Sequence, residues 1–428
     1  MASVVEKFPR PSVSWFTEAR LGMFIHWGLY ALAARHEWVK NREELSDDHY
    51  QRYFENFNPD LYDPRDWARR ASAAGMKYVV ITCKHHEGFC LWDSAHTDYK
   101  ATNTPWGRDP IEPFVTAFRE AGLRVGFYYS LLDWHHPDYT VDARHPQRND
   151  TKAREANTER DFRVYAKYMR DQVTELLTRF HPDIIWYDFS FPGEDGKGRD
   201  DWESEKLYAL TREICPDILI DNRLDLPGAA DFVTPEQFQS SEQPCDDDGN
   251  PVVWEACQTF SGSWGYHRDE DNWKSVDQLL RMLIDGVSKN GNLLLNVGPT
   301  ARGTFDSRAC ARLAGIGEWM KLNGRSIYGC GAAPSEWPVP QDCRYTYNAE
   351  TKRLYAHLFA WPFKHLHLPG MKGRVRYAQF LHDASEVQPV EQQPKSHTGA
   401  AVGENAHVLV LPTRKPEIEI PVVELVLQ

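Results

Sequence analysis

The apolar positions of the chain follow two alternating patterns through its first three quarters. Short runs rich in β-branched and aromatic residues predict buried strands at 21–28, 77–83, 124–130, 183–188, 217–223, 231–237, 252–259 and 291–297. Between these runs, apolar residues spaced three and four apart predict helices at 47–54, 64–74, 111–121, 155–180, 202–214, 275–288 and 306–323. The alternation predicts a mostly parallel sheet with helices outside it.

The number of predicted strands favours one α/β architecture over another. About eight strands within roughly 330 residues are typical of a (β/α)8-like TIM barrel with long loops. The later strands are uneven in length, so we expect an irregular barrel. The alternative is a doubly wound open sheet, but no glycine-rich nucleotide-binding loop follows any of the strands.

After about residue 335 the helical spacing disappears. Short strand-like runs occur at 344–347, 353–360, 364–368, 375–381, 406–411 and 420–427, and turn residues separate them. This pattern is typical of an antiparallel β-sandwich. We therefore expect two domains, a (β/α)8-like barrel over residues 1–334 and a C-terminal β-sandwich over residues 335–428.

Charge and composition exclude two classes of partner. The net charge of −13 over 428 residues leaves no excess of lysine and arginine to neutralise nucleic-acid phosphates. No apolar run approaches the roughly 18 residues of a membrane helix. The N-terminus lacks the basic and then apolar segments of a signal peptide, and the eight scattered cysteines indicate a reducing compartment. We expect a cytoplasmic protein, or a periplasmic or secreted one if a leader has been removed.

Polar side chains gather where the predicted strands end, as catalytic residues do in parallel α/β sheets. These positions are His26, His85 with His86, Tyr128 with Tyr129, Asp188, Arg223, Glu236 and Glu255. Neighbouring residues in a regular strand point to opposite faces, so Gly88 would have to allow a turn for both adjacent histidines to reach one ligand. Aromatic residues make up 13% of the chain, and many adjoin these polar groups. Such a surface suits a ligand with apolar C–H faces and polar edges, such as a sugar ring.

Paired carboxylates among aromatic rings are what glycoside hydrolysis requires. Asp188 follows four apolar or aromatic residues, where a carboxylate is costly unless it is hydrogen-bonded or functional, or caps the next helix. Glu236 and Glu255 compete for the second carboxylate role. The alternative for Glu236 is a solvated loop position. The alternative for Glu255 is a buried structural role as a partner of Arg223 or of a histidine. Arg223 is suited to holding a catalytic carboxylate ionised, or to a plain surface ion pair.

Seven motifs in a fixed order identify a family. They are FIHWG at 24–28, KHHEGF at 84–89, YYS at 128–130, WYD at 186–188, DNR at 221–223, WGY at 264–266 and GNLLLNVGP at 291–299. Together they resemble the α-L-fucosidases of glycoside hydrolase family 29, over about residues 15–328. The predicted C-terminal β domain agrees with this resemblance. The family often has aspartate where Glu87 stands, which is a conservative change.

The resemblance implies a retaining, exo-acting α-L-fucosidase that needs neither a cofactor nor a metal. Asp188 would be the nucleophile and form a covalent fucosyl-enzyme. Glu236 would be the acid/base, with Glu255 as second candidate, because family members place this residue at differing positions. The fucose pocket would comprise His26, Glu37, Trp38, His85, His86, Tyr128, Trp186, Arg223 and Trp264. Trp264 would pack on the C6 methyl group.

The partner implied is a fucosylated oligosaccharide or glycoconjugate, and a homo-oligomer is compatible with it. Linkage preference among α1,2, α1,3/4 and α1,6 fucosides would depend on loops beyond the pocket, including 133–150 and 195–201. Two other functions stay open. One is a metal-dependent hydrolase on the same barrel, although the H-x-H pair usual near its first strand is absent. The other is a non-catalytic fucose-binding protein, against which Asp188 and the full pocket set count.

Overall fold

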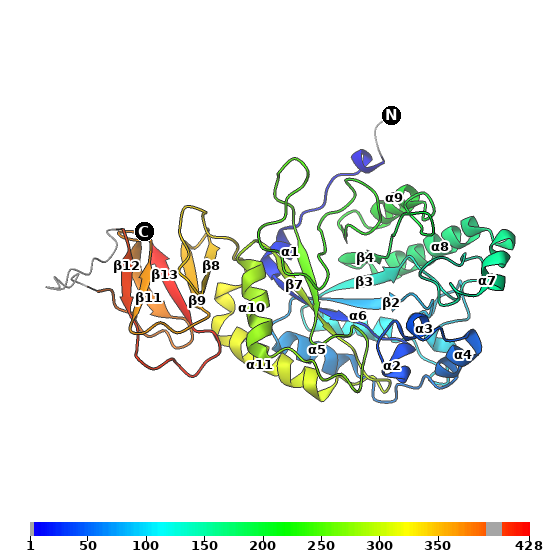
Figure 1. Cartoon of the computed structure of the whole chain (residues 1–428), viewed down its shortest axis with the longest axis horizontal. Helices are drawn as coiled ribbons and strands as arrows, with labels where there is room; N and C mark the ends of the chain where they lie inside the picture. The colour runs from blue at the N-terminus through cyan, green and yellow to red at the C-terminus, as the bar shows by residue number, and fades with distance from the viewer. Residues whose placement is uncertain (1–3, 391–404) are drawn as a thin grey trace.

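A seven-stranded parallel sheet forms the centre of the computed structural model, which describes residues 4–390 and 405–428 (Figure 1). Its strands are β1 (Leu21–Ile25), β2 (Tyr78–Lys84), β3 (Arg124–Ser130), β4 (Ile184–Asp188), β5 (Leu219–Ile220), β6 (Glu255–Thr259) and β7 (Asn292–Val297). Their order is β5-β4-β3-β2-β1-β7-β6. Strands that are consecutive in the chain are neighbours from β1 to β5 and from β6 to β7, and β7 pairs with β1, so the sheet curls into a half-barrel. A doubly wound sheet would reverse direction at an inner strand, so that alternative is wrong.

Helices pack around the sheet. They are α1 (Ser14–Ala19), α2 (Tyr30–Ala33), α3 (Val39–Arg42), α4 (Asp47–Glu55), α5 (Pro64–Ala73), α6 (Ile111–Glu120), α7 (Thr151–Glu155), α8 (Phe162–Phe180), α9 (Ser204–Ile214), α10 (Val276–Val287) and α11 (Ser307–Asn323). Side-chain caps define several starts, such as the capping box that Ser275 and Gln278 form at α10. None of the helices within the described ranges has both the length and the apolar character needed to cross a membrane.

The helix expected at 155–180 is wrong at its N-terminal end. The chain forms α7 and a 3₁₀ turn at Ala156–Glu159, and α8 begins only at Phe162. Between them Arg160 is extended, with φ −91° and ψ 136°. Asp161 then caps α8, because its side chain accepts a hydrogen bond from the backbone N–H of Arg163. A residue that caps a new helix cannot continue the previous one, so the helical spacing spans a break.

The strand expected at 231–237 is not a regular strand. This segment lies between β5 and β6, where an eighth strand would stand. The N–H of Asp231 donates to Ile220 O at 2.8 Å, and the segment meets β6 only through isolated bridges. Pro235 has no N–H to donate, and Gln237 adopts the left-handed region with φ +49°. Both features interrupt a ladder, so the chain between β5 and β6 is irregular here.

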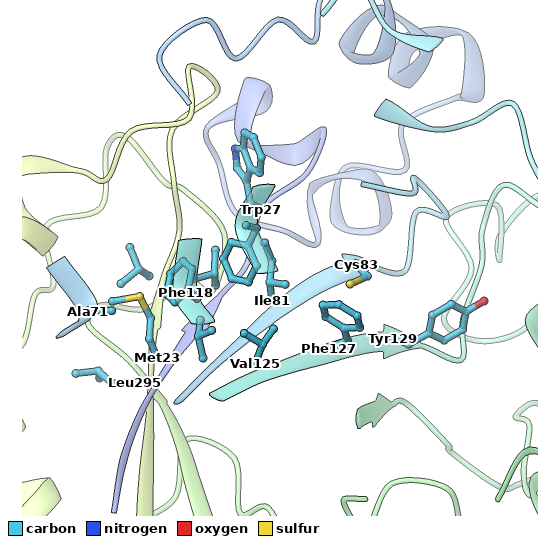
Figure 2. Packing of buried hydrophobic residues seen from close by; sticks show 14 of the residues in the cluster. Met23, Trp27, Ala71, Ile81, Cys83, Phe118, Val125, Phe127, Tyr129 and Leu295 are labelled. Carbon is cyan, nitrogen blue, oxygen red and sulfur yellow. The ribbon is translucent and has the colours of Figure 1, made fainter. Parts of the chain in front are cut away.

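Both faces of the sheet are buried, because successive strand residues point to opposite sides. The outward residues pack beneath the helices, as Figure 2 shows for Met23, Ile81, Val125, Phe127 and Leu295. The inward residues form a second cluster that includes Phe24, Val80, Tyr128, Ile184, Trp186 and Leu294. Successive apolar residues of each strand therefore belong alternately to two separate hydrophobic cores.

The inward register also positions the polar groups. His26 lies two residues beyond Phe24, and Asp188 lies two residues beyond Trp186. Each polar residue therefore shares the inward face with the aromatic residue that precedes it in register. The ring centroids of Phe24 and His26 lie 4.5 Å apart, and those of Phe24 and Trp186 lie 5.3 Å apart. An aromatic floor thus lies directly below the polar residues at the carboxyl ends of the strands.

The C-terminal region is antiparallel, as predicted. Its strands are β8 (Cys343–Asn348), β9 (Arg353–Leu358), β10 (His365–Leu368), β11 (Val375–Phe380), β12 (His407–Val410) and β13 (Val422–Leu427). They form a four-stranded sheet, β11-β13-β9-β8, and a two-stranded sheet, β10-β12, which share one apolar core. The region lies beside α10 and α11 (Figure 1), where Trp319 Nε1 donates to Ile420 O at 3.1 Å. The exact boundary at residue 334 stays a prediction.

Candidate active site

Side chains at the carboxyl ends of the strands line a cleft with about 340 Å³ of empty space. The lining residues are Phe24, His26, Trp38, His85, His86, Tyr128, Trp186, Asp188, Phe189, Glu236, Cys257 and Trp264. The sequence predicted all of them as site residues except Phe24, Phe189 and Cys257. Aromatic walls with a few convergent polar groups suit one sugar residue.

Asp188 is held by a hydrogen bond to each of its carboxylate oxygens. Tyr128 Oη donates to Oδ2 at 2.7 Å, and Arg223 Nη1 donates to Oδ1 at 2.8 Å. The residue is buried, with 7% of its surface exposed. It does not cap a helix, since α9 begins only at Ser204. The carboxylate is therefore fixed in orientation at the floor of the cleft.

Arg223 joins the two carboxylates of the cleft. Its Nη1 atom also donates to Glu236 Oε2 at 2.8 Å, so Asp188 Oδ1 and Glu236 Oε2 are at most about 5.6 Å apart. The guanidinium stacks on Trp186, 4.4 Å from the ring centroid. Its Nε atom donates to Thr234 Oγ1 at 3.1 Å. Burial alone would lower the pKa of Arg223, but the neighbouring acidic groups, Asp188 foremost, raise it above its ordinary value.

Glu236 is the accessible carboxylate of the pair. Its side chain is 43% exposed, whereas that of Asp188 is 10% exposed. It belongs to the irregular segment 231–237, which the N–H of Gln237 ties to Cys257 O on β6 at 3.0 Å. A carboxyl group at the mouth of the cleft can exchange its proton with both a bound ligand and solvent.

Glu255 lies at the opposite end of the sheet. It is the first residue of β6, is fully buried, and does not line the cleft. Tyr78 Oη donates to its Oε2 atom, and Trp186 Nε1 donates to its Oε1 atom at 3.4 Å. Burial raises the pKa of Glu255 to about 8. The expected place of Glu255 among the carboxyl ends of the strands is therefore wrong. The residue is buried, as the structural alternative expected, but its partners are Tyr78 and Trp186 and not Arg223 or a histidine.

His26 is a neutral imidazole with a defined tautomer. Asn296 Nδ2 donates to Trp264 O at 2.6 Å, which fixes the amide so that Asn296 Oδ1 accepts from His26 Nδ1 at 2.7 Å. Burial, followed by the nearby His85, lowers the pKa of His26 well below its ordinary value. A neutral ring protonated at Nδ1 has a lone pair at Nε2. His26 therefore offers a hydrogen-bond acceptor.

His86 has the same tautomer for a similar reason. Ser130 Oγ donates to Leu132 O at 2.9 Å, so it accepts from His86 Nδ1 at 2.7 Å. Burial and the neighbouring His85 lower the pKa of His86 well below its ordinary value. The free Nε2 atom lies 3.9 Å from Asp188 Oδ2. A ligand hydroxyl that donates to His86 would therefore lie beside the Asp188 carboxylate.

His85 lies between His86 and Tyr128, and its ring stacks on the phenol with centroids 5.7 Å apart. Its Nδ1 atom is 3.4 Å from Glu87 Oε2, and both atoms are buried without a hydrogen-bond partner among the described residues. Gly88 ends this turn with φ +84°, where a Cβ would collide with the Asp133 carboxylate. The predicted turn thus lets both histidines line one cleft.

A buried ion pair supports the histidine turn from behind. Lys84 Nζ lies 3.0 Å from Asp133 Oδ2, and the side chains are 0% and 2% exposed. The other oxygen of Asp133 accepts from the N–H groups of His135 and His136, each at 3.0 Å. The N–H of Trp134, which lies between Asp133 and His135 in the chain, donates to His86 O at 2.8 Å. The sequence analysis missed this pair, although Lys84 opens the KHHEGF motif.

Glu37 supports the Trp264 wall of the cleft. Its Oε2 atom accepts from the N–H of Trp264 at 3.1 Å and from that of Gly265 at 2.9 Å. The indole of Trp264 lies 5.2 Å from the His26 ring. Trp38, the next residue after Glu37, packs on His86 at 4.8 Å. One short segment thus contributes to two walls.

Phe189 is a lining residue that the sequence analysis missed. It follows Asp188 and adopts φ +78°, a left-handed conformation that is costly for a bulky residue. Its ring packs 5.1 Å from His86 and 5.2 Å from Trp38. The turn at Phe189 ends β4 abruptly, so the Asp188 side chain lies at the strand end with an aromatic wall beside it.

The metal-hydrolase alternative requires His26, His85, His86 and Asp188 to converge on a cation. Within residues 4–390 and 405–428, no group of three or more histidine, cysteine or acidic side chains is arranged to hold a metal ion. Both oxygens of Asp188 accept hydrogen bonds, one of them from the cationic Arg223. A second cation beside that arginine would be repelled, so the donor set does not fit a metal.

Comparisons with known proteins identify the family of the chain. The sequence profile described as α-L-fucosidase matches residues 3–325. The plasma α-L-fucosidase of Rattus norvegicus is 32% identical over 382 residues, which cover 82% of this chain and 78% of that protein. Among solved structures, α-L-fucosidase isoenzyme 1 from Paenibacillus thiaminolyticus is 43% identical, with a TM-score of 0.90 and full coverage of both chains.

A further solved structure bears on the reaction. It is a family 29 α-L-fucosidase from Bacteroides thetaiotaomicron, described as a trapped covalent intermediate in complex with 2-fluoro-fucosyl fluoride. It is 28% identical to this chain, has a TM-score of 0.80, and the match covers 96% of this chain and 95% of that one. The similarity therefore extends over the sheet, the cleft and the C-terminal region.

Proposed function

The chain belongs to the α-L-fucosidase family, glycoside hydrolase family 29, and from this premise we propose that it removes terminal α-L-fucosyl residues from glycans with retention of configuration. The spacing of the two carboxylates carries the proposal. Oxygens of Asp188 and Glu236 that share Arg223 Nη1 are at most about 5.6 Å apart. Retaining glycosidases separate their carboxyl groups by about 5–5.5 Å, and inverting ones by about 6.5–9.5 Å, so the upper bound on this one pair of oxygens agrees with the retaining class.

Asp188 is the proposed nucleophile. Its two hydrogen bonds, from Tyr128 and Arg223, orient the carboxylate and hold it ionised in a nearly closed site. In the first step a carboxylate oxygen attacks the anomeric carbon as the bond to the glycosidic oxygen breaks. The product is an ester between Asp188 and fucose. The covalent intermediate in the Bacteroides thetaiotaomicron relative supports this step.

Glu236 is the proposed acid/base. It donates its proton to the glycosidic oxygen as the aglycone leaves. In the second step its carboxylate removes a proton from a water molecule that attacks the anomeric carbon, and the ester bond to Asp188 breaks. Arg223 contacts both carboxylates, so it stabilises the charge that moves between them during the two steps. Glu255 is not suited to this role, because Tyr78 and Trp186 occupy both of its oxygens at the far end of the sheet.

Fucose recognition is proposed to use the two neutral histidines as acceptors. His26 and His86 each present an unprotonated Nε2 atom, which suits sugar hydroxyl donors. Trp264 packs beside His26 and offers an apolar surface for the C6 methyl group. The small closed floor leaves space for a single sugar residue. This geometry supports exo-action on a terminal fucose, with the aglycone leaving past Glu236.

The curled sheet is proposed to be a (β/α)8 barrel in which the segment 231–237 occupies the remaining strand position. Backbone hydrogen bonds from this segment to both β5 and β6 support closure. Closure explains why Glu236, from an irregular segment, lies within reach of Asp188 at the end of β4.

Hydrolysis of 4-nitrophenyl α-L-fucoside tests the proposed function, with proton NMR of the first fucose released. The proposal predicts α-L-fucose as the initial product, which then mutarotates. Initial β-L-fucose would overturn retention. Binding of fucose without hydrolysis would favour the non-catalytic alternative. A panel of α1,2, α1,3, α1,4 and α1,6 fucosides assayed in parallel would establish the linkage preference.

A further inference from the structure

The side chains of the DNR motif continue the sheet where the backbone of β5 stops. The ladder between β4 and β5 ends with the pair Ile185 and Ile220. Beyond that pair, the N–H of Tyr187 donates to Oδ1 of Asp221 at 3.1 Å. This contact lies inside the protein, since Asp221 is 0% exposed. A side chain thus takes the place of a strand backbone at the residue that precedes Asp188.

Asn222, the next residue of the motif, makes a similar connection to the segment 231–237. Its Oδ1 atom accepts from the backbone N–H of Thr234 and from Thr234 Oγ1, each at 3.0 Å. The backbone carbonyl of Thr234 accepts from Arg223 Nη2 at 3.2 Å. Both backbone polar groups of Thr234 are therefore bonded by side chains of the DNR motif.

Backbone groups of β6 hold the same segment at the residues that flank Glu236. The N–H of Cys257 donates to Pro235 O at 3.1 Å, and the carbonyl of Cys257 accepts from the N–H of Gln237 at 3.0 Å. Glu236 lies between these two anchored residues. Because the ring of Pro235 restricts φ, a displacement of Thr234 would be transmitted to Glu236. The bonds from Asn222 to Thr234 therefore help to set the position of the Glu236 carboxyl group.

We propose that the DNR motif positions both carboxylates through separate side chains, an inference that rests on the proposed function. Asn222 is a positioning residue for the acid/base Glu236, because it holds the segment from which that carboxyl group reaches the glycosidic oxygen. Asp221 is a positioning residue for the nucleophile Asp188, because it holds the end of β4. A displacement of about 1 Å at a reacting group can lower the rate about 100-fold.

Two substrates with different leaving groups separate the two roles. Formation of the fucosyl-enzyme from α-L-fucosyl fluoride needs the nucleophile but little help from an acid. The same step with the best-cleaved disaccharide of an α1,2, α1,3, α1,4 and α1,6 fucoside panel needs both. The ratio of kcat/KM for the disaccharide to that for the fluoride therefore reports the acid. Both values scale with the concentration of active enzyme, so partial unfolding leaves this ratio unchanged.

Asn222→Ala should lower the ratio about tenfold, which corresponds to about 1.4 kcal/mol. Asn222→Asp keeps an oxygen that accepts from Thr234 and should hold the ratio within about threefold of the wild-type value. Asp221→Ala should lower both kcat/KM values by the same factor and leave the ratio unchanged. Burial raises the pKa of Asp221 well above its ordinary value, so Asp221→Asn resembles the protonated form and should restore both values.

Asn348→Ala is the matched control, because Asn348 Oδ1 also accepts from a backbone N–H, that of Thr351 at 2.9 Å, but in the C-terminal region. Both of its kcat/KM values should equal those of the wild type. An unchanged ratio in Asn222→Ala, or a changed ratio in Asp221→Ala, would overturn the positioning roles. A wild-type enzyme that cleaves neither substrate would instead overturn the proposed function, so the two failures are distinguishable.

Discussion

The Nη1 atom of Arg223 lies 2.8 Å from Oδ1 of Asp188, and the same atom donates to Glu236. One cation thus fixes both the buried and the exposed carboxylate of the cleft. Trp186 supports the guanidinium from its face at 4.4 Å. The planar group is required, because a flat donor can stack on the indole and bond two carboxylates in one plane. The spacing that supports retention therefore depends on this residue.

Arg223→Lys should lower kcat about 10- to 100-fold, since a lysine ammonium cannot stack on Trp186 while bonding both carboxylates. Steady-state kinetics with 4-nitrophenyl α-L-fucoside measure this. Arg35→Lys is the control, because Arg35 forms an exposed ion pair with Glu43 at 2.6 Å and should leave kcat unchanged. Wild-type kcat in Arg223→Lys would contradict the bridging role.

Glu236→Gln should show a loss that depends on the leaving group. Its kcat/KM for a fucosyl disaccharide should fall about 100-fold or more, because the leaving oxygen needs a proton. The loss on α-L-fucosyl fluoride should be much smaller, since fluoride leaves without one. Glu255→Gln should affect both substrates to the same extent. A leaving-group-dependent loss in Glu255→Gln would assign the acid/base role to Glu255 instead.

Glu255 should make the stability of the fold depend on pH. Burial raises its pKa in the folded protein from 4.5 to about 8, so between these values the folded chain binds a proton that the unfolded chain does not. The contribution of Glu255 to the free energy of unfolding is fully present below about pH 4.5. It declines by about 1.4 kcal/mol per pH unit as the pH rises to about 8. Glu255→Gln mimics the protonated form and should flatten the decline.

Chemical denaturation at pH 5, 6, 7 and 8 measures the difference between the wild type and Glu255→Gln. The prediction concerns the slope of the free energy of unfolding against pH, which should be less negative in the variant. Equal slopes for the two proteins would mean that Glu255 is ionised in the fold throughout this range.

Ser130 should control catalysis through the tautomer of His86. Ser130→Ala removes the acceptor of the Nδ1 proton, so the ring is free to place its proton on Nε2, which then no longer accepts from a sugar hydroxyl. We expect kcat/KM to fall about fivefold to tenfold. Nitrogen-15 NMR of the imidazole reports the tautomer directly. Unchanged kinetics with the Nδ1–H tautomer retained would contradict the role of Ser130.

The sequence predicted the parts of the site that follow from strand position. His26, Tyr128 and Asp188 were predicted as site residues because the side chains at the carboxyl ends of parallel strands lie at one edge of the sheet. Asn296 was missed, although it follows the inward-facing Leu294 by two residues on β7. The alternation of the strand would have found it, but its function depends on which atom of His26 it contacts, and that requires coordinates.

Long-range hydrogen bonds account for the other differences. Glu37 was grouped with the fucose-binding residues, which stays a prediction, but its hydrogen bond to the backbone of Trp264, 227 residues away, was not expected. Local spacing contains no information about such a contact. The segment 231–237 has strand-like composition, but Pro235 and the left-handed Gln237 interrupt its pairing. Residues 155–161 have helical composition, and only the cap at Asp161 divides them from α8.

Covalent labelling of Asp188 tests the central claim most directly. In 2-deoxy-2-fluoro-L-fucosyl fluoride the C2 fluorine slows both steps, while the reactive fluoride leaving group lets the intermediate accumulate. Mass spectrometry of the intact enzyme should show one added fluorofucosyl group, and peptide mapping should locate it on Asp188, with no label in Asp188→Asn. A label on any other residue, or equal labelling of Asp188→Asn, would contradict Asp188 as the nucleophile.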